Sequence, residues 1–138
     1  MTRTKSLMAS MIIALIASAP AVSAAQTALK DDPTVREGFY AIGLADEVRR
    51  NCPQIKPRLV RAYTLVKSLE TYARDKGYTE AQIDALVRDD AAKEELRAEI
   101  RADLAGRGAT PGNTAAYCSV GREEIARGSQ AGRLLKGM

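Results

Sequence analysis

The sequence predicts an all-α fold: a small orthogonal bundle of four to six helices, stapled by one disulfide, after an N-terminal signal peptide. Aromatic residues are only 4% of the chain, with no Trp and one Phe, so Leu, Ile, Val and Ala must build most of the core. That composition favours helices over a β-sandwich. Apolar residues recur at spacings of three and four in successive segments, and we find neither an alternating strand pattern nor an internal repeat.

Residues 1–24 have the three parts of a secretory signal peptide. Arg3 and Lys5 form a basic start, residues 7–17 are apolar, and Val22-Ser23-Ala24 supplies the small residues that signal peptidase reads. The apolar run is about 11 residues, whereas a membrane-spanning helix needs about 20. We expect cleavage after Ala24 or Ala25, periplasmic localisation, a single helical domain over 25–138 and no stable membrane insertion of that domain.

The predicted export changes the charge balance. The chain has 21 basic and 17 acidic residues, but Arg3 and Lys5 leave with the signal peptide. One stretch of the remaining chain is basic and the next is mostly acidic, a dipolar arrangement (Lys56, Arg58, Arg61 and Lys67; then Asp84, Asp89, Asp90, Glu94, Glu95 and Glu99). Clustered bases interleaved with aromatic stacking residues are missing, so we do not expect nucleic-acid binding.

The two cysteines of an exported chain predict one disulfide, between Cys52 and Cys118. It would close a loop of about 67 residues and stabilise the fold by roughly 4 kcal/mol. A redox site is the alternative, but redox-active cysteines usually stand two residues apart beside a helix start. The predicted role is therefore structural.

The first three helices are predicted from start and stop signals. Asp32-Pro33 is typical of a helix start, and a helix follows over 33–50, until Asn51-Cys52-Pro53 breaks it. Pro57 is expected to open the second helix, which Gly77 ends. Thr79 to Gln82 reads as a capping box that begins a short third helix, ending near Arg88.

The remaining helices follow in the same way. Asp89 or Asp90 caps a fourth helix with an apolar stripe, which Gly106 and Gly108 end. After a loop over 106–113, Thr114 begins a fifth helix that contains Cys118. Gly128-Ser129 indicates a stop followed by a new cap and a last short helix.

The chain lacks the residue patterns of common catalytic and metal sites. It contains no His, which excludes histidine-based triads and histidine-ligated metals. Ser129 lies between glycines without the spacing of a nucleophile elbow, and the adjacent acid pairs point about 100° apart on a helix. We expect no catalytic residue, no metal site and no cofactor.

The segment Tyr117 to Ile125 has two interpretations. Gly121 in mid-helix weakens the helix unless another backbone, such as that around Cys52, packs closely against it. A tightly packed core helix is the interpretation we favour. In the other, Gly121 and Tyr117 form the floor of a small groove that binds an acidic peptide or partner, with arginines around it (Arg122, Arg127 and Arg133).

Several motifs resemble a known family. They are Asn51-Cys52-Pro53, Arg61-Ala62-Tyr63, Gly77-Tyr78, Pro111-Gly112, Tyr117 to Ile125, and Gly128-Ser129 through Leu134-Leu135. Together they resemble a domain-of-unknown-function family of small exported helical proteins from Rhodobacter-like alphaproteobacteria. The resemblance implies export and kinship and assigns no activity.

The function expected from these features is non-enzymatic. The signal peptide, the disulfide and the missing catalytic groups favour a periplasmic protein-binding module whose partner is another envelope protein or peptide. The alternative is a periplasmic stress chaperone resembling the small acid-activated helical chaperones. In that alternative, protonation of acids such as Glu94, Glu95 and Glu99 raises the net charge and loosens the fold.

Overall fold

A computed structural model describes residues 28–138, so the predicted signal peptide lies outside the described residues. After a 3-10 turn (η1, Leu29–Asp31), the helices are α1 (Pro33–Asn51), α2 (Leu59–Asp75), α3 (Glu80–Arg88), α4 (Asp90–Gly106), α5 (Thr114–Arg127) and α6 (Gln130–Arg133). Two short strands complete this part of the chain, β1 (Ile55–Pro57) and β2 (Leu135–Gly137). The predicted all-α bundle is confirmed.

Five of the six described α-helices begin after a capping side chain, and α2 is the exception. Asp32 accepts hydrogen bonds from the amides of Thr34 and Val35 at the start of α1. Thr79 and Gln82 form the predicted capping box of α3, and Asp89 caps α4. Each cap satisfies backbone donors that a helix start leaves free, so these boundaries follow from local sequence.

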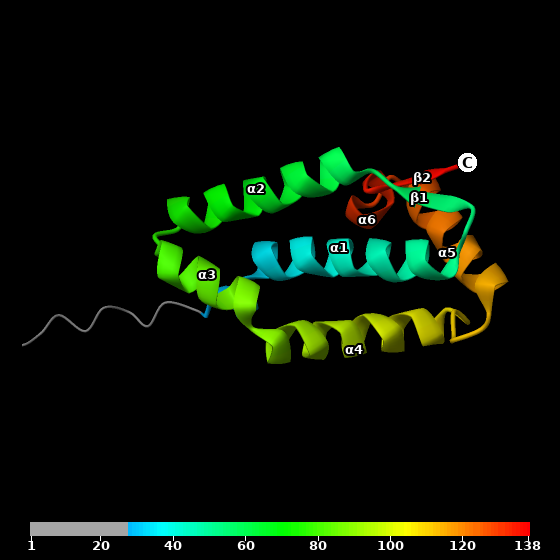
Figure 1. The fold of residues 1–138 in the computed structure, drawn as a ribbon, viewed down its shortest axis with the longest axis horizontal. Helices are drawn as coiled ribbons and strands as arrows, with labels where there is room; N and C mark the ends of the chain where they lie inside the picture. Colours follow the sequence, from blue (N-terminus) through cyan, green and yellow to red (C-terminus); the bar gives the residue numbers. More distant parts are fainter. Residues whose placement is uncertain (1–27) are drawn as a thin grey trace, which may run out of the picture.

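The first helix is the centre of the bundle. In Figure 1, α2 and α4 lie on opposite sides of α1, and α3 connects them across one end of it. At the other end α1 contacts α5, α6 and β1. The predicted disulfide is confirmed: Cys52, directly after α1, is bonded to Cys118 of α5, with a Cα–Cα distance of 5.1 Å.

The expectation of no strand is wrong for a few residues. β1 and β2 pair antiparallel, with Ile55 opposite Gly137 and Pro57 opposite Leu135. Pro57 therefore lies in a strand, and α2 begins two residues later than predicted. Strands of three residues carry too little pattern to be predicted, because their pairing depends on a partner far away in the sequence.

The buried residues form two clusters of unequal size. The larger surrounds the disulfide and joins α1, α4, α5, α6 and both strands. The smaller lies at the α3 end and is built on Leu29, Val35, Ala73, Tyr78 and Ile83. Among the described helices, none combines the length and the apolar character needed to cross a membrane.

Candidate functional site

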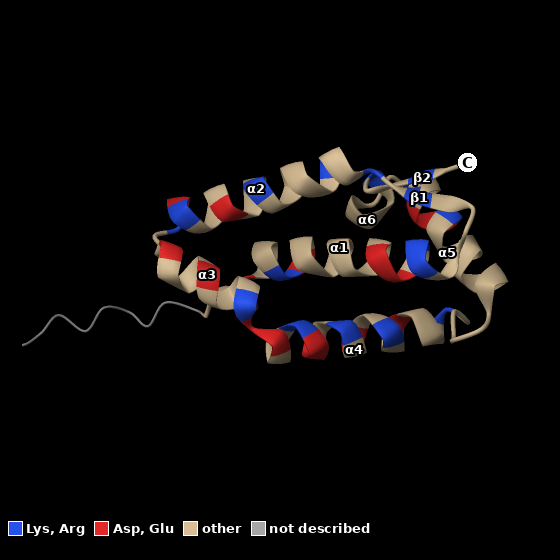
Figure 2. Cartoon of the chain, in the orientation of Figure 1, with Lys and Arg blue, Asp and Glu red and all other residues tan. Residues whose placement is uncertain are grey.

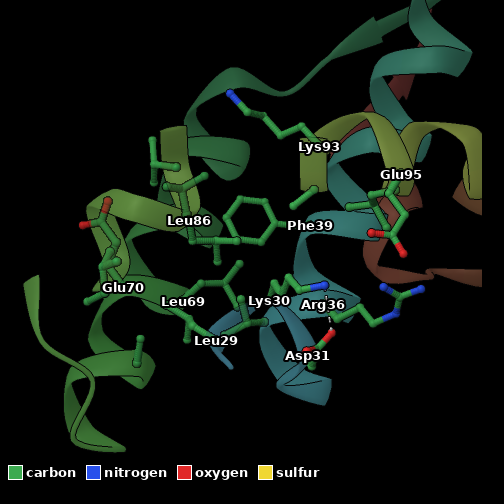
Figure 3. A pocket seen from close by; sticks show the side chains of 17 residues that line it. Leu29, Lys30, Asp31, Arg36, Phe39, Leu69, Glu70, Leu86, Lys93 and Glu95 are labelled. Carbon is green, nitrogen blue, oxygen red and sulfur yellow. Dashed lines mark ion pairs between the residues drawn. The ribbon is translucent and has the colours of Figure 1, made fainter. Parts of the chain in front are cut away.

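An apolar cavity of about 370 Å³ lies beside the smaller cluster. Its walls come from η1 and from the facing sides of α1, α2, α3 and the start of α4. Eleven apolar residues line it, and Figure 3 shows the Phe39 ring in the middle of them (Leu29, Val35, Phe39, Val66, Leu69, Ala73, Ile83, Leu86, Val87, Ala92 and Leu96). The volume lies in the usual range of ligand sites.

The cavity follows from the arrangement of the helices. The helices α2 and α4 lie on opposite sides of α1, and the short α3 packs beside η1 at one end of it (Figure 1). The side chains of these elements leave the cavity between them. Val87, at the edge of the lining, leaves 53% of its surface exposed, so the cavity is open to solvent there.

The remaining six lining residues are charged, three basic and three acidic (Lys30, Asp31, Arg36, Glu70, Lys93 and Glu95). The Nζ atom of Lys30 lies 3.7 Å from the Oδ1 atom of Asp31. Arg36 forms an ion pair with Glu99 of α4. The Nζ atom of Lys93 lies 2.7 Å from the Oδ1 atom of Asp90. Among the described residues that line the cavity, none has a neutral polar side chain. Its rim is thus charge-balanced, and its wall offers only apolar contact.

A second, polar hollow lies between α1, α4, α5 and α6 and is organised around Glu124. This carboxylate is 3% exposed and accepts hydrogen bonds from Arg107 at 2.8 Å, from Arg127 and from the Ser129 hydroxyl. On the α1 side of the hollow, the Tyr40 hydroxyl donates to Asp103 at 2.8 Å. Each of these polar groups is hydrogen-bonded to another of them. We therefore interpret them as a structural network.

The titration of these groups agrees with that interpretation. Burial by itself raises the pKa of Glu124, but the hydrogen bonds from Ser129 and Arg107 and the nearby arginine charges lower the pKa below its ordinary 4.5. Burial and the bond to Asp103 raise the pKa of Tyr40 above its usual range. At neutral pH, Glu124 is therefore charged and the Tyr40 phenol protonated, and neither is suited to exchanging protons with a substrate.

A family model of unknown function, DUF5333, matches residues 27–136. The chain belongs to this family. The resemblance to a family of unknown function is thereby confirmed, while the bacterial group and the export that it implied stay predictions. No curated protein and no solved structure matches the chain.

In this DUF5333 chain, the five residues predicted to bind a partner have separate surroundings. Tyr117 and Gly121 are buried in α5. Arg122 is hydrogen-bonded to Gln54 at 3.5 Å, Arg127 belongs to the Glu124 network, and Arg133 donates to the carbonyl of Gly128 at 2.7 Å. The partner-binding role of these residues stays a prediction.

The close packing expected at Gly121 is present, but side chains make it. A Cβ there would lie 2.2 Å from Ile55 Cδ1 and 2.6 Å from Val48 Cγ1, whereas backbone was expected. The glycine that meets backbone is Gly132 of α6, where a Cβ would lie 1.9 Å from the carbonyl oxygen of Glu124. Nothing local in the sequence distinguishes Gly132, because its neighbour comes from another helix.

Sequence reasoning also missed the cavity. Phe39, Leu69 and Leu86 have the spacing of ordinary core residues, and their helical pattern is satisfied equally by a filled core. The single signal available was the scarcity of large aromatic side chains, which leaves short aliphatic residues to fill the space. Within the described residues, no group of three or more Cys, Asp or Glu side chains could hold a metal ion.

Proposed function

We propose that this protein is an exported, non-enzymatic binding protein of the periplasm, and that the cavity beside α3 binds an apolar segment of a partner protein. The observation that supports this most is the composition of the cavity, an apolar wall inside a rim of balanced charge. Such a site favours burial of apolar surface, at about 25 cal/mol per Å².

The same composition argues for a protein segment over a small metabolite. Sites for metabolites add a few polar groups that converge on the ligand and fix its orientation. A charged lipid or fatty acid would favour a rim of one sign, whereas this rim carries both signs equally. An amphipathic peptide satisfies both features, because its apolar side chains enter the cavity and its polar flanks meet charges of either sign.

A cavity-filling substitution tests the proposal. Ala92→Leu adds a larger apolar side chain to the cavity wall, so it should occupy the binding space without loss of stability. The matched control is Ala98→Leu, an exposed position of the same helix that does not line the cavity. A photo-crosslinking residue at the exposed Val87 then reports what enters the cavity in intact cells.

We expect crosslinks to an apolar peptide of another protein in the wild type and in Ala98→Leu, and their loss in Ala92→Leu. Equal crosslinking in both leucine variants would contradict the cavity as the binding site. Crosslinks only to residues of the same chain would show that the cavity is covered internally. The intact mass of the exported protein tests export separately, since it should begin at Ala25 or Gln26.

A further inference from the structure

The start of α2 and the paired strands form a surface with basic and apolar side chains but no acidic ones. No Asp or Glu occurs over residues 51–69 or over 125–138. Figure 2 shows Lys and Arg on both strands and at the start of α2, whereas acidic residues lie on other parts of the fold, among them α1, α3, α4 and α5. We call the surface made by β1, β2 and the first turns of α2 the basic end.

Two lysines of the basic end lie directly opposite each other. Lys56 of β1 and Lys136 of β2 are cross-strand partners in the antiparallel pair, and both are exposed. Like charges in this position destabilise a strand pair. Neither lysine forms an ion pair with an acidic side chain anywhere in residues 28–138. A negatively charged partner at this place would remove the repulsion.

Two arginines extend the positive charge from the strands to α2. Arg58 donates through Nε to the carbonyl of Leu135 at 3.0 Å, and Arg61 donates to the carbonyl of Arg133 at 3.4 Å. These contacts hold the start of α2 against α6 and β2. Because the partners are neutral carbonyls, the charges of the arginines are not cancelled by acids.

Large apolar side chains protrude beside these charges. Leu59 is 71% exposed, Val60 80% and Tyr63 64%, and all three belong to the first two turns of α2. The Nζ atom of Lys67 lies 5.7 Å from the centre of the Tyr63 ring. Lys67 also pairs with Glu70 at 2.8 Å. Single exposed apolar residues are common on protein surfaces, but three together beside the bases of this end indicate a surface with a partner.

We propose that the basic end docks on an anionic lipid bilayer, with Leu59, Val60 and Tyr63 in the headgroup region and the lysines and arginines against the lipid phosphates. The charge is complementary to such a surface, and the mixture of bases with protruding aliphatic and aromatic residues is the pattern of interfacial membrane helices. An acidic protein would also complement the positive charge of the basic end. It would then need a groove on its own surface to receive the protruding apolar side chains. Docking would leave the cavity beside α3, at the far end of α2, open.

Vesicle sedimentation tests this inference on the exported protein, using phosphatidylcholine vesicles with and without roughly 30% phosphatidylglycerol. Lys56→Gln with Lys136→Gln should weaken binding to the anionic vesicles about fivefold for each lysine, so on the order of 25-fold together. The control, Arg88→Gln with Arg97→Gln, removes the same net charge from exposed positions of α3 and α4. Leu59→Gln with Val60→Gln tests the apolar contribution.

The inference predicts binding only to the anionic vesicles, a loss of binding at high salt, and weakening by both basic-end variants but not by the control. The lysine variant should unfold at the same temperature as the wild type or higher, which separates lost binding from lost folding. Absence of vesicle binding, or equal weakening by the control, would overturn the inference. So would weakening by the lysine variant alone, because it would show that Leu59 and Val60 do not enter the headgroup region.

Discussion

Replacing Gly132 by Ala should cost more stability than any other glycine-to-alanine change in the bundle that leaves φ in an ordinary range. The added Cβ would lie 1.9 Å from the carbonyl oxygen of Glu124 and 2.3 Å from its carbonyl carbon. Both atoms belong to the backbone of α5, which cannot rotate away as a side chain can. Since Cβ atoms keep at least 3.0 Å from such neighbours, α6 must retreat from α5 by about 1 Å.

That retreat disturbs the Glu124 network. Ser129, which caps α6, donates its amide to the Glu124 carbonyl at 3.2 Å and its hydroxyl to the carboxylate. Overpacking costs roughly 1 to 3 kcal/mol, and a weakened hydrogen bond to a charged group adds about 1.5 to 3 kcal/mol. We therefore expect a loss of about 3 to 5 kcal/mol, or a fall of roughly 12 to 20 °C in the unfolding temperature.

Two other glycines provide the comparison in the same thermal and urea unfolding assay. In Gly121→Ala the added Cβ meets the ends of two side chains, which can shift. The variant should therefore lose about 1 to 3 kcal/mol of the free energy of unfolding. In Gly106→Ala the added Cβ has no neighbour within 4 Å, and the position needs no positive φ. This variant should leave the stability of the fold unchanged or raise it by up to about 1 kcal/mol. A Gly132→Ala variant within roughly 0.5 kcal/mol of wild type would refute the reasoning.

Two more predictions concern the disulfide and the Glu124 network. Replacing Cys52 and Cys118 by Ser should lower the free energy of unfolding by about 2 to 5 kcal/mol, because the long loop becomes free in the unfolded state; urea unfolding measures this, and reduced wild type that matches oxidised wild type would contradict it. Glu124→Gln should cost about 2 kcal/mol at pH 7, whereas Glu123→Gln, at an exposed position, should cost less than about 0.5 kcal/mol. Since the folded pKa of Glu124 is below the unfolded 4.5, its stabilisation is present above pH 4.5 and lost as pH falls through the folded pKa. The cost of Glu124→Gln should shrink accordingly in urea unfolding at acid pH, and a cost independent of pH would argue against a charged Glu124.

The candidate site was less predictable from sequence than the fold. Most helix boundaries depend on residues a few positions apart, so Asp32, Thr79 and Ser129 could be recognised as caps directly. The start of α2 was the exception, because Pro57 pairs with the distant Leu135. The cavity beside α3 depends on how far α2 and α4 stand apart on the two sides of α1. That separation is set by packing over the whole bundle, and Phe39 has the same sequence pattern whether it lies in a filled core or beside a cavity.

The sequence by itself determined the helical class, the order of the helices, their caps and the only disulfide that two cysteines allow. These features depend on local hydrogen bonding, on apolar spacing and on cysteine number. Tertiary structure alone decided the pairing of Lys56 with Lys136, the contact of Gly132 with α5 and the burial of Glu124 beneath two arginines. The physical reason is that each of these features needs residues from different elements to meet, such as β1 with β2, α6 with α5, and Arg107 at the end of α4 with Glu124 of α5. That approach is set by the packing of the complete bundle.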